Sequence, residues 1–267
     1  ATVTVWFEFQ DLFLNSSLIM GFCVNGVILL LTAAAATDAA KLPSNFGRCS
    51  KSDPKMPECL RANVEDAIQK LKDGSSELGL KRFEPLDIPE LIIGEGKGPV
   101  NVVQHFKDVE LYGLTGSKVQ RVNFDFDKKE MHARSITPEL RLQGQYSMKG
   151  RILLLPIVGS GPCNVTLINT KINHTLIAEP FEKKGRTYWS FKDYTVTLRP
   201  ERVIFKFDNL FDGDSRLGDE INKVLNDNWD EVFTDVREGY EKSFGLIFHG
   251  LANRVFTRVA LSDIFLE

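Results

Sequence analysis

Residues 214–259 read DSRLGDEINKVLNDNWDEVFTDVREGYEKSFGLIFHGLANRVFTRV and show one helical pattern over most of their length. Apolar side chains recur every three or four residues from Leu217 to Val259, and no proline interrupts them. Asp214 or Ser215 supplies the N-cap that such a helix needs. At about 1.5 Å per residue the helix would span roughly 60 Å, more than the width of a compact domain of this size. A helix of that length requires an equally long apolar groove.

The preceding region, residues 100–211, shows the alternation of apolar and polar side chains that is typical of antiparallel strands. Phe124 and Phe126, for example, alternate with Asn123 and Asp125. Turn signals divide the region into about six or seven strands in a meander; they lie at residues 113–116, 127–129, 149–150, 159–162, 183–185 and 199–200. Such a sheet can supply the groove only by curving around the C-terminal helix.

The region before the sheet adds a shorter helix over residues 59–72 and an extended, proline-punctuated stretch over residues 85–99. We therefore predict an α+β fold in which a highly curved antiparallel β-sheet wraps a long C-terminal helix, with a short N-terminal helix beside it. Aromatic side chains on sheet and helix suit a solid core or a tunnel. Close packing, the usual state of protein interiors, favours the solid core on fold physics alone.

The first forty residues differ from the rest of the chain. They contain no Lys or Arg, three acidic residues, and an apolar run over residues 18–36 that ends in four alanines. This pattern predicts a cleaved signal peptide within residues 1–40, with Met20 as the true initiator and the residues before it as an upstream artefact. A retained membrane anchor is the alternative. The secreted, extracellular domain would then comprise residues 41–267.

The net charge of this domain limits the classes of partner that it is expected to bind. Removing the three acidic residues of the first forty from 36 leaves 33, which equals the 33 Lys and Arg residues. A neutral chain without a basic stripe is not expected to bind nucleic acid or an anionic membrane surface, and we expect no stable membrane insertion.

Four cysteines are present, and Cys23 lies in the predicted signal region. Cys49 and Cys59 are ten residues apart in a polar loop, which is the usual setting for a short disulfide in an exported domain. Cys163 is left over, either as a buried thiol or as a partner for an intermolecular disulfide. Asn164 and Asn173 begin sequons that could be glycosylated after export.

No catalytic or metal-binding pattern stands out. The four histidines lack the spacing of a zinc helix, and no G-x-S-x-G turn is present; they are His105, His132, His174 and His249. The glycine-rich run at residues 94–98 leads into a strand, so it lacks the helix N-terminus that a phosphate loop requires. We expect no catalytic residue, no metal and no cofactor.

The most specific part of the sequence is its C-terminal portion. Phe211-Asp212-Gly213-Asp214 leads into LGDEIN at residues 217–222 and LNDNW at residues 225–229, and the chain closes with LANRVF at residues 251–256. With the early pair Cys49 and Cys59, this order resembles the insect takeout and juvenile-hormone-binding family, and its takeout-like branch in particular. The resemblance covers residues 41–267. The second disulfide of the hormone carriers would need two further cysteines, and only Cys163 is present.

The resemblance implies the wrap fold, an internal hydrophobic tunnel, and a passive carrier of a terpenoid, juvenile-hormone-like or fatty-acid-like ligand. It also implies a setting in haemolymph or another extracellular fluid and an association with feeding, circadian and chemosensory physiology. Two alternatives remain: a lipid-recognition protein of defence that acts at membranes, and an extracellular signalling ligand for an unidentified receptor. A secreted hydrolase would need a nucleophile and base near a pocket, and no residue set in the sequence nominates them.

Candidate ligand contacts are inward-phase apolar residues, for each of which ordinary core packing is the alternative. They are Phe124, Phe126, Leu142, Tyr146, Phe205 and Phe207 from the sheet, and Trp229, Phe233, Tyr240, Phe244 and Phe248 from the helix. Tyr146 and Tyr240 are of special interest, because a hydroxyl in an apolar interior needs a hydrogen-bond partner and a ligand carbonyl could provide it.

Overall fold

The computed structural model describes residues 40–94, 98–152 and 155–267. The predicted signal peptide lies outside these residues except for Ala40, which forms a parallel bridge with Val259. The boundary between signal peptide and domain therefore stays a prediction.

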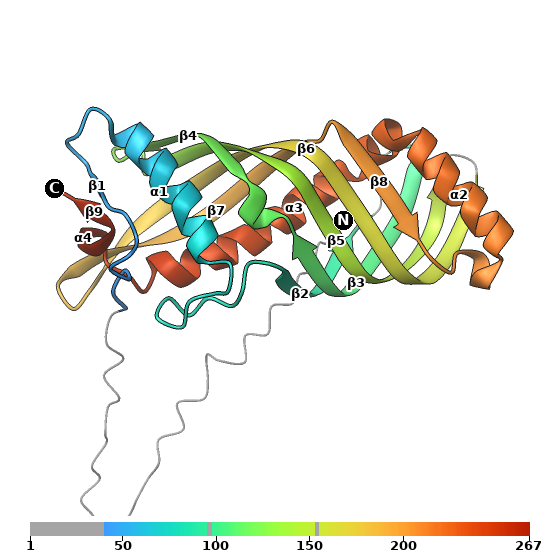
Figure 1. The fold of residues 1–267 in the computed structure, drawn as a ribbon, viewed down its shortest axis with the longest axis horizontal. Helices are drawn as coiled ribbons and strands as arrows, with labels where there is room; N and C mark the ends of the chain where they lie inside the picture. The colour runs from blue at the N-terminus through green and yellow to red at the C-terminus, as the bar shows by residue number, and fades with distance from the viewer. Residues whose placement is uncertain (1–39, 95–97, 153–154) are drawn as a thin grey trace, which may run out of the picture.

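Seven antiparallel strands form the main sheet, in the order β2-β3-β5-β6-β7, with β4 paired to β5 and β8 paired to β6 (Figure 1). Their bounds are β2 Leu86–Ile93, β3 Val100–Tyr112, β4 Lys118–Asp125, β5 Glu130–Ile152, β6 Leu155–Lys183, β7 Arg186–Arg199 and β8 Arg202–Phe207. The strand β5 pairs with β6 along its whole length, and each of these two long strands holds two shorter partners on its other edge. The predicted antiparallel sheet is confirmed.

Two of the predicted turns are wrong. Residues 149–150 lie inside β5, and residues 159–162 lie inside β6. The glycines that suggested turns serve close contacts between strands: a Cβ on Gly150 would lie 2.2 Å from the backbone oxygen of Asn101, and one on Gly159 would lie 2.8 Å from the hydroxyl of Tyr146. Glycine in a strand often marks such a close approach rather than a turn.

The predicted single C-terminal helix is also wrong in one respect, because it is two helices, α2 Ser215–Asp227 and α3 Trp229–Phe256. Asn228 leaves the helical conformation between them with φ −115° and ψ 30°, and its amide donates to the backbone oxygen of Val224. Asp214 is the N-cap, since its side chain accepts a hydrogen bond from the backbone nitrogen of Leu217. The break lets α2 follow β8 while α3 follows β7.

Two asparagines on α2 fix that helix to β8. The side-chain oxygen of Asn222 accepts from the backbone nitrogen of Phe207, and its amide donates to the backbone oxygen of the same residue, at 2.9 and 2.8 Å. Asn226 holds Phe205 in the same way, at 3.0 and 2.7 Å. Each side chain thus mimics a neighbouring strand, and α2 takes its direction from β8.

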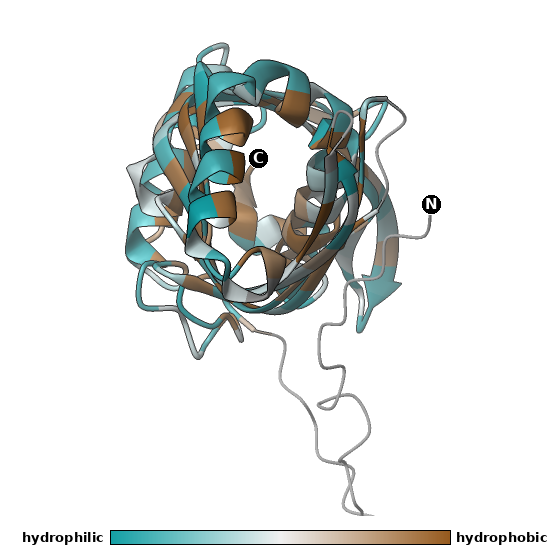
Figure 2. Ribbon diagram, turned by 90° about the vertical axis from the view of Figure 1, so that its right-hand side faces the viewer, coloured by the Kyte–Doolittle hydropathy of each residue, from teal (hydrophilic) through white to brown (hydrophobic). Residues whose placement is uncertain are grey.

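The helix α3 lies inside the curve of the sheet and contacts β2 and β7, the two ends of the strand order, as well as β3 and β8. Seen from the end that carries α2, the sheet and the helices surround a central axis (Figure 2). The buried side chains of α3, among them Phe233, Tyr240 and Phe244, belong to the core cluster inside the sheet. This is the predicted α+β wrap.

We expect Gly245→Ala to lower the free energy of unfolding by about 1–3 kcal/mol, because a Cβ there would lie 2.6 Å from the backbone oxygen of Tyr194 on β7. Gly250 is the matched control on the same helix, since a Cβ there meets nothing within 4 Å. Gly250→Ala should raise the free energy by about 0.5–1 kcal/mol through helix propensity. Urea unfolding of both variants tests the contact, and equal effects would contradict it.

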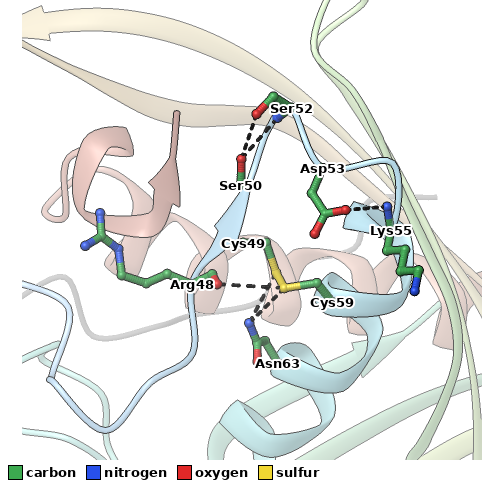
Figure 3. The surroundings of a disulfide bond; sticks show 8 residues. All are labelled: Arg48, Cys49, Ser50, Ser52, Asp53, Lys55, Cys59 and Asn63. Atoms are coloured by element: carbon green, nitrogen blue, oxygen red, sulfur yellow. Dashed lines mark hydrogen bonds between the residues drawn. A yellow bond between two sulfur atoms is a disulfide. The ribbon is translucent and has the colours of Figure 1, made fainter.

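The N-terminal helix α1, Met56–Lys70, begins three residues before its predicted start and ends two residues before its predicted end. The predicted disulfide between Cys49 and Cys59 is present and joins β1, Cys49–Ser50, to α1 (Figure 3). Because β1 pairs with β9, Phe265–Leu266, the disulfide also fastens α1 to the end of the chain. The remaining short elements are η2 Leu114–Gly116, η3 Phe211–Gly213 and α4 Leu261–Ile264.

Candidate ligand-binding cavity

The interior is packed at one end and hollow toward the other. The end that includes α2 is filled by a large cluster with many phenylalanines, among them Phe106, Phe205, Phe233 and Phe244. Toward the other end, a cavity of about 270 Å³ lies between α1 and the C-terminal half of α3. The interior therefore contains both a packed cluster and a cavity.

Side-chain size explains where the cavity forms. On β5 the inward positions along the cavity are Ala133, Ser135 and Thr137, and on α3 Ala252 faces the same space. At the packed end the corresponding inward positions hold larger side chains, such as Leu142, Tyr146 and Met148 on β5 and Phe233 and Tyr240 on α3. Small side chains on facing elements leave volume that the backbone, held by the ladders of β4, β5 and β6, does not close.

The cavity wall is predominantly apolar and comes from many elements. Apolar lining residues include Val64 and Ile68 of α1, Phe83 after it, Val122 of β4, Leu176 of β6 and Leu251 of α3. A wall of this kind, with a few polar groups, is typical of a site for a small hydrophobic molecule.

The principal polar feature of the wall is a connected set of three side chains. Ser135 Oγ lies 3.1 Å from His174 Nε2, and Tyr194 Oη lies 3.1 Å from His174 Nδ1. Burial lowers the pKa of His174 to about 4, so its ring is neutral at neutral pH. Burial also raises the pKa of Tyr194, which keeps its hydroxyl protonated. A second pair, Ser117 Oγ and Thr137 Oγ1 at 2.7 Å, lies in the same wall.

A serine beside a histidine raises the question of nucleophilic catalysis. Ser135, however, lies in the middle of β5, which pairs with β4 on one side and β6 on the other, so the ladders engage its backbone. An acyl-transfer site needs backbone or side-chain donors for the oxyanion, and usually an acid to orient the histidine. Here a tyrosine occupies that orienting position. The arrangement therefore suits ligand binding better than hydrolysis.

A second hollow, of about 400 Å³, lies between β7 and the outer side of α3. Its residues include the exposed charges Lys192, Asp193 and Lys242. Such a polar groove offers an apolar molecule little burial, so the cavity next to α1 is the candidate site.

Residues 27–266 match the sequence profile of a family described as Haemolymph juvenile hormone binding protein. The chain belongs to this family. Two similar proteins are both named Circadian clock-controlled protein daywake. The one from Drosophila melanogaster is 26% identical over 246 residues, covering 89% of this chain and 94% of its own. The one from Drosophila yakuba is 25% identical over 254 residues, covering 91% and 96%.

The crystal structure of Epiphyas postvittana Takeout 1 has the same fold, with a TM-score of 0.74, 24% sequence identity, and coverage of 82% of this chain and 99% of that one. The predicted membership of the takeout and juvenile-hormone-binding family is thereby confirmed. The haemolymph juvenile hormone binding protein family is one of hydrophobic-ligand carriers rather than of enzymes. Across the residues that the structure describes, no helix combines the length and apolar character needed to cross a membrane.

Among the sequence-predicted ligand contacts, Phe248 lines the cavity. Phe124 stacks on Trp189, and Phe126 packs against both rings at tilted angles, in an aromatic cluster that includes Phe265 of β9. The other eight belong to the packed cluster or pack against it: Leu142, Tyr146, Phe205, Phe207, Trp229, Phe233, Tyr240 and Phe244. Ligand contact by these residues stays a prediction.

The two tyrosines of special interest have protein partners. Tyr146 donates to the backbone oxygen of Asp208 at 2.8 Å, and Tyr240 donates to the side-chain oxygen of Gln104 at 3.1 Å. Their hydroxyls therefore do not need a ligand. The cavity instead presents His174 and Tyr194, which the sequence did not single out; the signal was His174 in the inward phase between Ile172 and Leu176.

The remaining sequence features lie outside the cavity. Cys163 is a buried thiol in the packed cluster, the first of the two alternatives for it, and burial raises its pKa to about 12. Asn164 and Asn173 both lie on β6. Asn173 is exposed, and Asn164 is partly buried with its side-chain oxygen accepting from Thr166. Glycosylation at the two sites stays a prediction.

Proposed function

We propose that this chain is a secreted carrier that encloses a small hydrophobic molecule, such as a terpenoid or a long-chain lipid derivative, in the cavity between α1 and α3. The observation that supports the proposal most strongly is the apolar cavity itself, next to a packed core of the same fold. Membership of a family of hydrophobic-ligand carriers agrees with it. The disulfide and the predicted signal peptide support secretion.

Passive burial can provide the affinity. Removing about 300 Å² of apolar ligand surface from water is worth roughly 7 kcal/mol at about 25 cal/mol per Å², before the costs of ordering the ligand. The volume of about 270 Å³ is close to the lower end of the range for small-molecule sites, about 300–1,000 Å³. A carrier of this kind needs no cofactor and no chemical step.

Filling the cavity should abolish binding. We expect Ala252→Trp to weaken binding of the fluorescent probe N-phenyl-1-naphthylamine at least tenfold, because an indole at this position would occupy the space that the ligand needs. The titration is a direct fluorescence measurement on the purified full chain.

Leu246→Trp is the matched control, because Leu246 is exposed on the same helix and belongs to the outer groove. It should leave probe affinity unchanged. Loss of binding in the Leu246 variant with normal binding in the Ala252 variant would place the site in the outer groove and contradict the proposal.

A further inference from the structure

Ser135, His174 and Tyr194 form a hydrogen-bonded chain of side chains in the cavity wall, and this chain indicates which ligands the cavity accepts. Its members come from three adjacent strands: Ser135 from β5, His174 from β6 and Tyr194 from β7. In the described part of the structure, the two hydroxyls have no hydrogen-bond partner other than the ring nitrogens of His174. Phe248 of α3 packs against both His174 and Tyr194 and covers one side of the two rings.

The three side chains have one more hydrogen to donate than the two hydrogen bonds between them use. A neutral histidine carries one N–H, and each hydroxyl carries one O–H, which makes three hydrogens for two links. If Tyr194 donates to Nδ1, then Nε2–H donates to Ser135, whose own hydrogen is left over. With the other tautomer, Ser135 donates to Nε2 and the hydrogen of Tyr194 is left over. Either way, one end of the chain has a donor without an acceptor.

We propose that Ser135, His174 and Tyr194 form a hydrogen-bonded chain that donates its one spare hydrogen to a neutral oxygen of the ligand, such as a ketone, ester, ether or alcohol oxygen. The inference rests on the proposed function, for which it names the ligand chemistry. A buried donor left unpaired is costly, so a ligand that supplies an acceptor is favoured over a hydrocarbon of the same shape.

The charges of the wall argue against an ionised ligand. Arg134 is the one charged residue among those that line the cavity, and its Nε donates to the side-chain oxygen of Asn173 on the outer face of the sheet. A carboxylate in the cavity would therefore be buried without a cation, which is far more costly than burying a carbonyl. The site should accept a fatty ketone or ester and exclude the fatty acid anion.

Three probes of similar shape test this specificity on the full chain: 2-tridecanone, 2-methyl-1-tridecene, in which a methylene group replaces the ketone oxygen, and dodecanoate. Displacement of N-phenyl-1-naphthylamine at pH 7 gives their relative affinities. We expect the ketone to bind about three- to tenfold more tightly than the alkene, the range of one hydrogen bond, and dodecanoate to bind more weakly than the ketone. Equal affinity for ketone and alkene would overturn the inference while leaving the carrier intact; no binding of any probe would refute the carrier itself.

Variants locate the donor. In the triple variant Ser135→Ala, His174→Leu, Tyr194→Phe, the preference for ketone over alkene should fall to about one, with alkene binding retained. Thr137→Val removes a hydroxyl from the same wall but outside the chain and should keep the preference. Loss of the preference in the Thr137 variant alone would overturn the assignment.

Nitrogen-15 NMR of the histidine rings tests the inference on the wild-type protein. The one variant it requires is His174→Leu, which assigns the His174 signals. The ketone should shift the balance between the two neutral tautomers of His174, whereas the alkene should leave it unchanged. An identical His174 spectrum with both ligands bound would overturn the inference.

Discussion

Lowering the pH from 7 to 4 is expected to reduce the free energy of unfolding by about 3 kcal/mol through His174. Burial is the cause of its lowered pKa, about 4 against an ordinary value of 6.5. Between these two values the unfolded chain holds a proton on this histidine and the folded chain does not, so stability falls as the pH falls through this window. Below about pH 4 both states are protonated and the loss stops growing.

The measurement is urea unfolding of the wild type and His174→Leu at intervals from pH 7 to pH 4. Other groups contribute alike to both proteins, so the difference between the two curves isolates His174. Ser135, Tyr194 and Phe248 are among the side chains that contact the ring, and Tyr194 stays neutral throughout because its pKa is raised. Parallel curves for the two proteins would show that the ring is not buried in its neutral form.

Replacing both Asn222 and Asn226 with leucine should cost about 3 kcal/mol of stability. The two amides make four hydrogen bonds to the backbone of Phe205 and Phe207, and each bond is worth about 0.5–1.5 kcal/mol. Leucine approximates their volume but leaves this edge of β8 without partners. Thermal and urea unfolding of the double variant measures the effect.

Asn228→Ala is the control for this experiment, because the Asn228 amide makes one bond, to the backbone oxygen of Val224 in the preceding helical turn. It should cost about 1 kcal/mol. A double variant no less stable than the Asn228 variant would mean that α2 is held to β8 by apolar packing rather than by its asparagines.

The sequence predicted the wrap fold because periodicity reports which face of an element is buried. Alternation of apolar and polar side chains within residues 100–211 and helical spacing after Asp214 each correspond to elements of the structure, the first to β4, β5 and β8 and the second to α2 and α3. Periodicity did not reveal the break at Asn228, because the apolar spacing runs through it without interruption. Nor could it separate glycines that form turns from Gly150 and Gly159, whose role depends on a neighbouring strand.

The cavity was harder to predict than the fold. An inward-facing side chain meets either another side chain or empty space, and the answer depends on which residues the register brings opposite one another. The prediction centred on large aromatic residues, but most of these fill the packed end or the cluster beside β9, and among the predicted contacts Phe248 alone lines the cavity. The cavity follows instead from small residues, Ala133, Ser135 and Ala252, that three-dimensional pairing places around one space.

The central claim, that the cavity carries a hydrophobic molecule, is tested most directly by native mass spectrometry of the full chain after secretion from an insect-cell host and removal of any glycans. We predict a mass that exceeds the polypeptide by one apolar passenger, which organic extraction releases and identifies, and which the Ala252→Trp variant lacks. A mass equal to the polypeptide alone, from a protein that also takes up neither 2-tridecanone nor N-phenyl-1-naphthylamine, would contradict the account and favour a receptor-binding role without cargo.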